Sequence, residues 1–379
     1  MVGGGPDAFI GAVHRSAARL DGRWTLVAGA FSSDPERSRQ HGLTLGLDAD
    51  RAYGSWAEML EAESRLAASE RIEAVVVVTP NHLHFPVARA TLEAGFDLVC
   101  DKPLTTTLSD AETLCRLGQE LGRIVCVTHN YTGYPMVKEA RERVAKGDLG
   151  EVRKIVVEYS QGWLRTLLEA QGHKQASWRG DPALAGPSSA LGDIGSHAHN
   201  LAAYVSGLHP SSLLADLVTH VSGRALEDDA TVLLRYDSGA RGLIMASQIS
   251  TGERNHLRLR VYGTEGTLDW LQERPDRLRL VAPSGTETIL HDGVEGLSAR
   301  ARAHLRLPAG HPEGFIEAFA NLYRNVAGTL RSRAEGRTPG PFDDDFPTAI
   351  DGARGVHFIE TALASHRSGA WEPAEYLEP

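Results

Sequence analysis

Apolar residues recur in runs of two kinds across the first third of the chain. The run from Ile72 to Val78 is almost entirely apolar and β-branched, which is typical of a parallel strand buried on both faces. Apolar positions then recur at helical spacing from Val87 to Ala94, and Gly95 suits a helix C-cap. Residues 96–100 form a second apolar strand. This order predicts one βαβ unit, with both strands ending at the carboxyl edge of one sheet.

The same alternation of short apolar strands and amphipathic helices continues on both sides of this unit. It predicts strands over residues 24–30 and 124–128 and helices over residues 53–68 and 108–121. Such an order predicts a doubly wound parallel sheet, and open sheets of this kind bind ligands at the carboxyl edge of their strands. We therefore expect residues 1–130 to form a dinucleotide-binding Rossmann domain.

Beyond residue 130 the pattern changes to strands that alternate apolar and polar residues. We expect a substrate-binding and oligomerisation α/β domain over residues 131–379, built on a large and mostly antiparallel sheet. Helices would cover one face of this sheet and leave the other free for a second subunit. The predicted strands are residues 152–159, 213–221, 230–236, 241–248, 257–262, 267–271 and 278–281. The predicted helices are residues 136–146, 192–205, 312–334 and 344–367, and a long functional loop covers residues 161–189.

Composition narrows the class of protein. The 379 residues, 42% of them apolar, are enough for two domains, and the net charge of −10 argues against a nucleic-acid partner. The three cysteines, Cys100, Cys115 and Cys126, lack metal-ligand spacing, so we expect buried reduced thiols and no metal site. The sequence has no run long enough to span a membrane and no signal-peptide pattern. We therefore expect a cytoplasmic protein without a membrane partner.

Glycines at Gly3, Gly5 and Gly11 precede a helical pattern near the start of the chain. A glycine turn that opens a helix binds phosphate through its backbone N–H groups, so we predict a pyrophosphate site for a dinucleotide here. The interval from Gly5 to Gly11 exceeds the standard spacing, and only Met1 and Val2 remain of the preceding strand. A plain glycine-rich arm is the alternative interpretation.

The end of the strand predicted over residues 24–30 would face the adenosine ribose of such a cofactor. Ser32, Ser33 and Arg37 could receive a 2′-phosphate, whereas Asp34 could contact a free 2′-hydroxyl. The sequence therefore leaves NAD and NADP as alternatives. Ser33 or Asp34 could also simply cap the helix that starts at residue 35.

Two segments carry candidate proton-transfer groups. Lys102 follows the strand over residues 96–100, at the expected ligand edge, where an amine can stabilise an alkoxide. Asp193 and His197 are four residues apart, so on a helix they share a face, with Asn200 beside them. A carboxylate next to an imidazole orients the ring as a general base. A solvated lysine and a surface ion pair are the alternatives.

In combination these segments resemble the Gfo/Idh/MocA oxidoreductases. The resemblance rests on Thr79-Pro80-Asn81 with His84, on Asp101-Lys102-Pro103, and on the segment from Gly192 to His197. It implies a Rossmann domain followed by an α/β domain, and a nicotinamide cofactor. It further implies Lys102, Asp193 and His197 as catalytic residues. Asp101 stands where the family usually has glutamate, and Asn200 stands where it often has an acid. Cofactor contacts are expected from Thr79, Asn81, His84, Asp101, Lys102 and Asn130.

The resemblance also implies hydride transfer between a secondary hydroxyl of a sugar, glycoside or cyclitol and the nicotinamide ring. His197, held by Asp193, would take the hydroxyl proton and Lys102 would stabilise the alkoxide, or the two roles could be exchanged. In either case we expect both residues to act on one substrate carbon. Glycoside cleavage with a recycling cofactor and a non-catalytic dinucleotide or sugar sensor are the alternatives. A homo-oligomer through the second sheet is expected. The substrate-side candidates are Tyr131, Trp163, Trp178, Arg179, His199 and Asn200.

Overall fold

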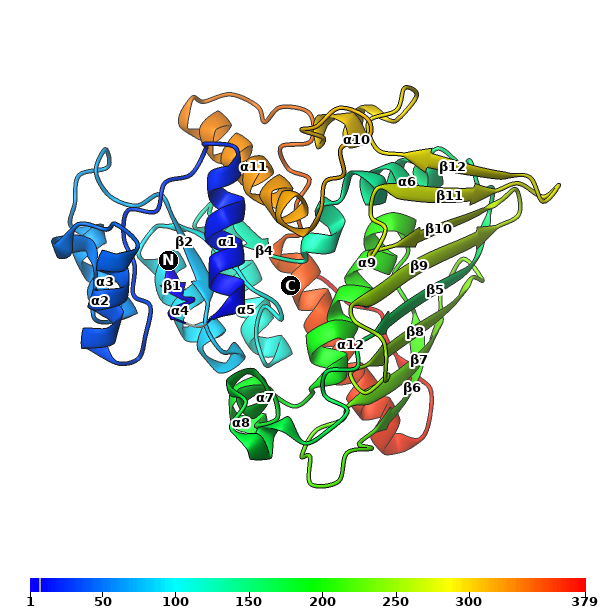
Figure 1. The fold of residues 1–379 in the computed structure, drawn as a ribbon, viewed down its shortest axis with the longest axis horizontal. Coiled ribbons are helices and arrows are strands. Elements are labelled where there is room, and N and C mark those ends of the chain that lie inside the picture. The colour runs from blue at the N-terminus through cyan, green and yellow to red at the C-terminus, as the bar shows by residue number, and fades with distance from the viewer. Residues whose placement is uncertain (7) are drawn as a thin grey trace. The chain divides into compact units, whose positions relative to one another are not determined.

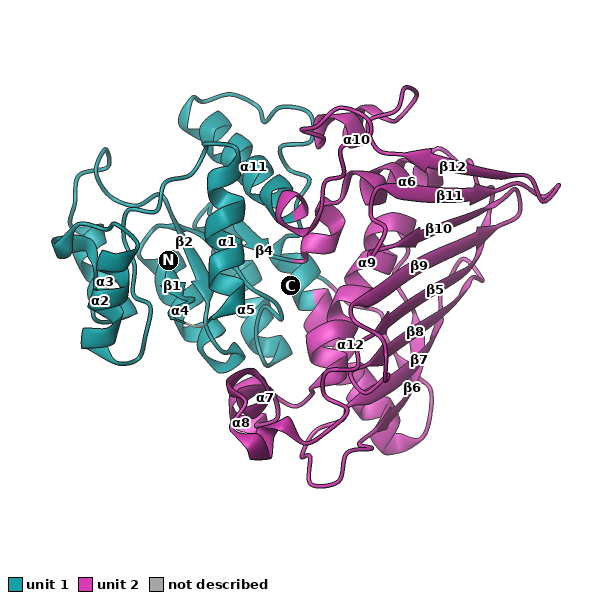
Figure 2. Cartoon of the chain, in the orientation of Figure 1, with its two compact units in different colours: residues 1–128, 319–353, 378–379 teal, residues 129–318, 354–377 magenta. Residues whose placement is uncertain are grey.

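The computed structural model describes residues 1–6 and 8–379 and divides into two compact units (Figures 1 and 2). Unit 1 contains residues 1–128, 319–353 and 378–379, and unit 2 contains residues 129–318 and 354–377. Each unit builds its own sheet, one parallel and one mostly antiparallel, which confirms the predicted fold class. Within the described residues, no helix has the length and apolar character needed to cross a membrane.

Unit 1 holds a four-stranded parallel sheet in the order β1-β2-β3-β4. Its central strands are rich in β-branched residues, and Val75 and Val77 are fully buried, as expected for strands covered on both faces. The three cysteines are free and buried, which confirms that prediction. The strands are β1 (Val2–Gly3), β2 (Ala74–Val78), β3 (Asp97–Cys100) and β4 (Val125–Val127).

The strand predicted over residues 24–30 is wrong. Only its last two residues pair, through single parallel bridges from Gly29 to Ala52 and from Ala30 to Val2. The ladder cannot extend, because β1 offers only two residues on one side and the chain at Ala52 offers one on the other. The sheet therefore continues beyond β1 in the expected order, but only as isolated bridges.

The helices of unit 1 differ in how their N-termini are capped. Asp34, Ser55 and Thr107 accept backbone N–H groups at the starts of three helices. The helices that follow β1 and β2 have Ala8 and Leu83 at this position, which carry no side-chain acceptor. The helices are α1 (Phe9–Leu20), α2 (Pro35–Thr44), α3 (Trp56–Ser64), α4 (His84–Glu93), α5 (Leu108–Glu120) and residues 319–334 of α11 (Phe315–Ala334).

Unit 2 holds a nine-stranded sheet in the order β12-β11-β10-β9-β5-β8-β7-β6-β13, in which only β5 and β8 are parallel neighbours. The seven predicted strands are present, and β12 and β13 are additional. The strands are β5 (Val152–Ser160), β6 (Ser212–Val218), β7 (Asp229–Arg235), β8 (Arg241–Ser247), β9 (His256–Gly263), β10 (Thr267–Leu271), β11 (Arg277–Val281), β12 (Glu287–His291) and β13 (Glu372–Pro373).

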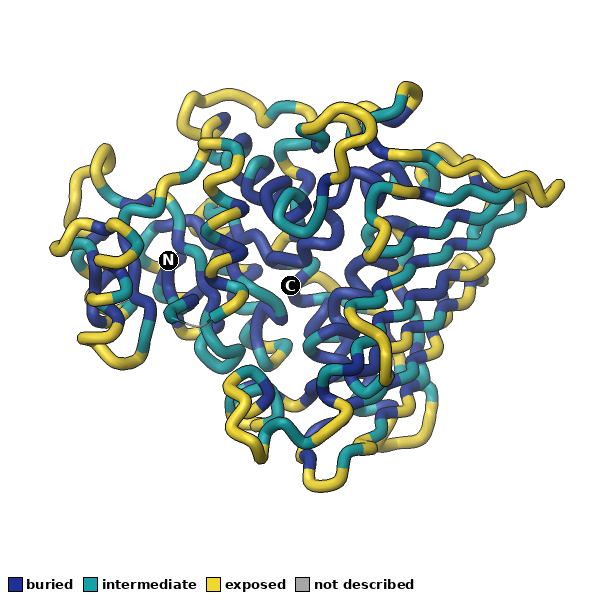
Figure 3. Tube along the Cα trace, in the orientation of Figure 1, coloured by how far each residue is buried: buried dark blue, intermediate teal, exposed yellow. Residues whose placement is uncertain are grey.

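One face of this sheet is covered by helices α6 (Pro135–Ala145), α9 (Ser196–Ser206) and the unit 2 part of α12 (Ala349–Ser368) (Figure 1). Residues on that face, such as Ile155, Val157 and Leu259, are fully buried, and the strands alternate between buried and more exposed positions (Figure 3). On the opposite face Leu233 and Met245 remain 42% and 39% exposed. The alternation confirms a sheet with one covered and one open face.

The predicted long loop over residues 161–189 contains a 3₁₀ helix (Leu168–Gln171) and two short α-helices, and Arg224 fastens it to the sheet. This buried guanidinium pairs with Glu169 at 2.7 Å and with Asp228 at 3.0 Å, and it donates to the carbonyl of Leu164 at 2.9 Å. The helices of unit 2 are α6 (Pro135–Ala145), α7 (Lys174–Arg179), α8 (Pro182–Ala185), α9 (Ser196–Ser206), α10 (Ala299–Ala303) and residues 354–368 of α12 (Ala349–Ser368).

Candidate functional site

The glycine turn of unit 1 packs directly against α1. Gly3 and Gly4 have positive φ angles of 82° and 67°, and a Cβ atom on Gly11 would lie 2.4 Å from the Cα of Gly4. Only glycine permits this approach. Arg15 braces the turn by donating to the carbonyl of Gly4 at 2.9 Å. Sequence reasoning missed Gly4 and Arg15, because neither belongs to the standard glycine motif.

The start of α1 suits an anionic group. Its N-cap residue, Ala8, has no side-chain oxygen, so the first N–H groups of the helix are not satisfied by a cap from that residue. Helix N-termini with a glycine turn in front of them bind phosphate in this way. A Cβ on Gly3 would lie 3.0 Å from the Thr79 side chain, so the turn adjoins the end of β2. These residues fit the pyrophosphate of a dinucleotide.

The segment after the bridge at Ala30 forms the cap that sequence reasoning kept as an alternative. Asp34 accepts the backbone N–H of Arg37 at 2.8 Å, and the Ser32 hydroxyl accepts the N–H of Asp34 at 3.2 Å. Asp34 therefore caps α2 with one carboxylate oxygen. Ser33 and Arg37 are exposed at this turn.

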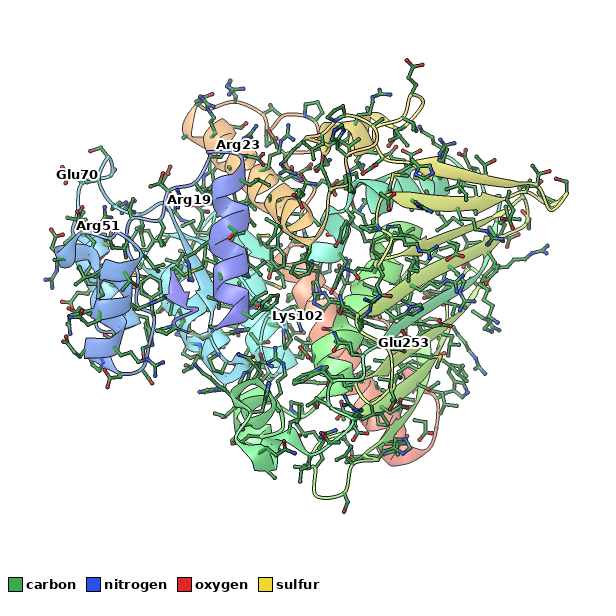
Figure 4. All side chains as sticks on the ribbon, viewed as in Figure 1. Arg19, Arg23, Arg51, Glu70, Lys102 and Glu253 are labelled. Carbon is green, nitrogen blue, oxygen red and sulfur yellow. The ribbon has the colours of Figure 1, made fainter. Side chains whose placement is uncertain are left out.

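Asp101 holds the lysine turn at the end of β3. Its carboxylate accepts the N–H of Lys102 at 2.8 Å and the hydroxyl of Thr128 at 2.9 Å, so an acid shorter than glutamate can hold this turn. The Lys102–Pro103 bond is cis, and Lys102 is labelled in Figure 4. The turn that follows β3 is thereby tied to the end of β4.

His84 joins the turns that follow β2 and β3. Its buried ring lies 2.7 Å from the Pro103 carbonyl through Nδ1 and 3.0 Å from the Thr79 carbonyl through Nε2. Burial lowers the pKa of this imidazole, although the nearby Asp101 and the two carbonyls oppose that shift. Asn81 begins the short helical turn between β2 and α4. Unit 1 thus brings the predicted Thr79, Asn81, His84 and Lys102 segments to one sheet edge.

In unit 2, Asp193 lies in a π-helical turn, Leu191–Gly195, that precedes α9. The uniform helix predicted over residues 192–205 is therefore wrong in its first turn: the N–H of Ser196 bonds to the carbonyl of Leu191, five residues earlier. A Cβ on Gly195 would lie 2.7 Å from the Leu191 side chain and 3.3 Å from Ala246 of β8. Glycine there allows the turn to lie close to the sheet.

The Asp193 carboxylate gathers partners from distant parts of unit 2. Its Oδ2 atom accepts Gln248 Nε2 at 2.8 Å and Arg179 Nε at 3.3 Å. The Arg179 guanidinium lies 4.2 Å above the Trp178 ring. The structure thus brings Asp193, Arg179 and Trp178 together. Sequence reasoning missed Gln248, because nothing in the local pattern connects the end of β8 with Asp193.

Aromatic rings surround His197. The ring centroid of Tyr131 lies 4.8 Å away, that of His129 lies 5.3 Å away, and that of Tyr159 lies 6.4 Å away. His197 itself is buried. The contacts to Tyr131 and His129 are edge-on. These walls restrict rotation of the imidazole and so orient it, which is what a general base requires.

A closed ring of hydrogen bonds fixes the tyrosine walls. Tyr159 donates to Asn255 Oδ1 at 2.8 Å, Asn255 Nδ2 donates to Tyr131 at 3.3 Å, and the Tyr131 and Tyr159 hydroxyls lie 2.5 Å apart. Tyr131 must then donate to Tyr159. Burial raises the pKa of both tyrosines, so both stay protonated near neutral pH. Trp163 joins the same network through Gln161, to which it donates at 2.9 Å.

The remaining predicted residues of unit 2 are buried. His199 stacks on Phe358 at 4.4 Å, in the packing between α9 and α12, and burial with neighbouring positive groups lowers its pKa to about 3. Asn130 follows β4 in a short helical turn. Among the described residues, Asn130 Nδ2 and Asn200 Oδ1 have no hydrogen-bond partner, and buried polar atoms of this kind are usually met by a ligand or water.

Comparison with known proteins identifies relatives along nearly the whole chain. Residues 1–129 match the model of the oxidoreductase family with an NAD-binding Rossmann fold, and residues 137–269 match the GFO/IDH/MocA C-terminal domain. An uncharacterized oxidoreductase of Bacillus subtilis, YfiI, is 32% identical over 98% of this chain and 94% of its own length. An inositol dehydrogenase homolog from Azotobacter vinelandii, solved with NADH and myo-inositol, is 36% identical with a TM-score of 0.91, covering 98% of this chain and 96% of that one. Levoglucosan dehydrogenase of Pseudarthrobacter phenanthrenivorans is 29% identical over 56% of this chain and 59% of its own length.

Proposed function

The chain belongs to the Gfo/Idh/MocA family of oxidoreductases, and we propose that it is an NAD-dependent dehydrogenase of a cyclitol or sugar secondary hydroxyl. The observation that carries the proposal is the set Lys102, Asp193 and His197, in a chain whose glycine turn fits a dinucleotide. A sensor of the same ligands would need no proton-transfer set. The solved relative with NADH and myo-inositol supports the cyclitol as substrate class.

The side chains divide the chemistry between them. NAD+ supplies the hydride acceptor when it is bound. His197 takes the proton of the substrate hydroxyl, and Asp193 favours the resulting imidazolium. Lys102 stabilises the developing alkoxide as a charged hydrogen-bond donor. Arg179 and Gln248 keep the Asp193 carboxylate in one direction.

We propose NAD rather than NADP as the physiological cofactor. Asp34 caps α2 through one oxygen and keeps the other for a ribose hydroxyl. A 2′-phosphate would meet this carboxylate at short range, which disfavours it by like-charge repulsion. Thermal shift measurements should give the larger stabilisation with NAD, because a ligand that binds only the folded state raises apparent stability. A larger shift with NADP would contradict this preference.

The activity itself is tested by mixing the purified protein with NAD or NADP and a panel of inositols, hexoses and levoglucosan. We expect reduced nicotinamide to form with at least one cyclitol or sugar. The Lys102→Ala variant should lose this turnover and keep its affinity for NAD. Absence of reduction with both cofactors across the panel would contradict the proposal, and release of an aglycone from glycosides without net reduction would favour the cleavage reaction.

We also propose that a second copy of the chain covers the open face of the nine-stranded sheet. Leu214, Leu233 and Leu243 are aligned in register across three neighbouring strands of that face. Met245 adjoins them, and an apolar row of this kind on an exposed face marks an interaction surface. A closed dimer would pair the row with its own copy.

Light scattering after gel filtration tests the oligomer. The chain should form a dimer or larger assembly, and Leu233→Lys should shift it toward the monomer. The matched control is Leu66→Lys, which changes a leucine that is likewise exposed on unit 1 and should leave the mass unchanged. A wild-type monomer would contradict the proposed contact.

A further inference from the structure

Glu227 is a buried carboxylate that holds the segment leading to Asp193. It lies just before β7 and is 7% exposed. Its Oε1 atom accepts the Ser188 hydroxyl at 2.6 Å, the Ser189 N–H at 2.8 Å and the Leu191 N–H at 3.1 Å. Three donors from four consecutive residues thus converge on one oxygen, although these residues lie far from Glu227 in sequence.

The hold extends beyond the three direct bonds. The Ser188 hydroxyl, which donates to Glu227, also accepts the N–H of Gly192 at 2.9 Å. The N–H of Asp193 bonds to the Ser189 carbonyl at 2.7 Å. The first N–H groups of a helix have no partners within the helix itself, and here Glu227 and Ser188 supply them.

The direction of Asp193 depends on this anchoring because the turn is π-helical. A π-turn contains one residue more than an α-turn, and each helical residue rotates the chain by about 100°. If the segment relaxed to an α-turn, Asp193 would rotate by about this angle relative to α9. Its carboxylate would then leave Gln248 and Arg179, both of which contact it in the observed turn.

We propose that Glu227 is a positioning residue for catalysis: its carboxylate oxygen holds the start of the π-turn and thereby keeps Asp193 directed toward its partners. The inference rests on the proposed function, in which Asp193 orients His197. It concerns hydrogen-bond acceptance at Oε1, so the negative charge of Glu227 is not required. Burial raises the pKa of Glu227, and the three bonds that its carboxylate accepts oppose this shift.

Two substitutions of Glu227 distinguish the effect of hydrogen-bond acceptance from the effect of negative charge. Glu227→Gln keeps an oxygen that can accept the same three bonds, so kcat should stay within about 3-fold of wild type. A change of this size corresponds to the loss of one weak hydrogen bond at most. Glu227→Ala removes the acceptor and should lower kcat by about 30-fold, with NAD affinity unchanged. The acid limb of the kcat/KM profile should also shift, since a displaced Asp193 carboxylate would no longer favour the His197 imidazolium.

Glu139→Ala is the matched control. Glu139 is another buried carboxylate of unit 2, which accepts the Ser298 N–H at 2.7 Å and pairs with Arg143 at 2.7 Å. Its loss should lower the unfolding midpoint as much as the loss of Glu227, but the folded enzyme should keep its kcat and pH profile. Equal kcat in the Glu227→Ala and Glu139→Ala variants would overturn the inference.

A second variant and a structural readout cover the remaining outcomes. Should Glu227→Ala fail to fold, Ser188→Ala keeps Glu227 but removes the hydroxyl that donates to it and that accepts the Gly192 N–H. This variant should lower kcat by about 5-fold, and a kcat equal to wild type would overturn the inference. If the wild-type chain shows no turnover, the proposed function fails, and crystal structures of the variants then decide. Loss of the Asp193–Gln248 contact in the variant supports the positioning role, and an unchanged contact overturns it.

Discussion

The candidate sites of the two compact units consist of different kinds of chemical group. In unit 1 the site consists mainly of backbone groups. These are glycines at positions where a side chain would collide with its neighbours, the N–H groups at a helix start, and the two carbonyls that contact the His84 ring. In unit 2 it is a network of side chains, in which Asp193 and Asn255 each receive donors from separate parts of the sequence. The first site should therefore be damaged by added bulk, and the second by loss of single polar atoms.

The strongest test of this contrast is Asp193→Asn. The amide cannot stabilise an imidazolium, although its oxygen can still accept the bonds from Gln248 and Arg179. We expect kcat to fall by about 10³-fold while NAD affinity stays unchanged, as for loss of a general-base partner. Steady-state kinetics and NAD titration measure the two effects. The control Asp216→Asn changes an exposed acid of β6 and should have no effect. A kcat within about 3-fold of wild type would remove Asp193 from the mechanism.

The second test concerns stability of the polar network in unit 2. Arg224→Met leaves the fully buried Asp228 without its cation, and breaking a buried pair in this way costs about 3 kcal/mol. Arg89→Met is the control, because its pair with Glu93 on α4 is exposed and should contribute about 0.5 kcal/mol. Urea unfolding followed by circular dichroism measures both. Similar losses in the two variants would show that burial does not govern these pairs.

The third test adds bulk to the backbone site of unit 1. A methyl group on Gly11 would lie 2.4 Å from the Cα of Gly4, so α1 must move away from the turn. We expect NAD affinity to fall by about 100-fold, the equivalent of about 2.7 kcal/mol. Gly118→Ala is the control in the same unit, since the added Cβ atom would lie 3.3 Å from its nearest neighbour, a Val125 methyl group. Isothermal titration that finds unchanged affinity for Gly11→Ala would exclude the turn from cofactor binding.

The fourth test compares a buried histidine from each unit. Burial lowers the pKa of His14 to about 4 and that of His199 to about 3. Below pH 6.5 the unfolded chain binds a proton at each ring and the folded chain does not, so stability falls as the pH falls. Between pH 7 and 5 each ring should account for about 2 kcal/mol of this loss.

Glutamine in place of either histidine tests whether the ring causes stability to fall as the pH falls. The decrease in unfolding free energy from pH 7 to 5 should be smaller by about 2 kcal/mol in His14→Gln and in His199→Gln than in wild type. Because His14 also bonds to Tyr323 through Nδ1 at 2.6 Å, the comparison uses the pH dependence and not the absolute stability. His311→Gln, at an exposed position, is the control. A wild-type dependence in both test variants would show that these rings are not the cause of acid sensitivity.

The local sequence pattern was enough to predict most helices and strands and the positions of the glycine and lysine turns. The strand at residues 267–271 has its predicted bounds, and the parallel sheet of unit 1 follows from buried valine runs. Partners that come from distant sequence could not be predicted: Gln248 on Asp193, Glu227 on the π-turn and Asn255 on the tyrosines. The failed strand at residues 24–30 has the same cause, since pairing depends on the length of its neighbours as well as on its own residues.

The terminal strand β13 limits how the large sheet can meet other chains. It adds only Glu372 and Pro373 beside β6, and proline cannot donate a hydrogen bond to a further strand. Beyond β13, the N–H groups of Ala215 and Leu217 on β6 donate to Ser365 and His366, so this rim is closed to sheet extension of the kind that drives fibrous self-association. A subunit that approaches from this side must stack on the flat surface of the sheet instead of prolonging it.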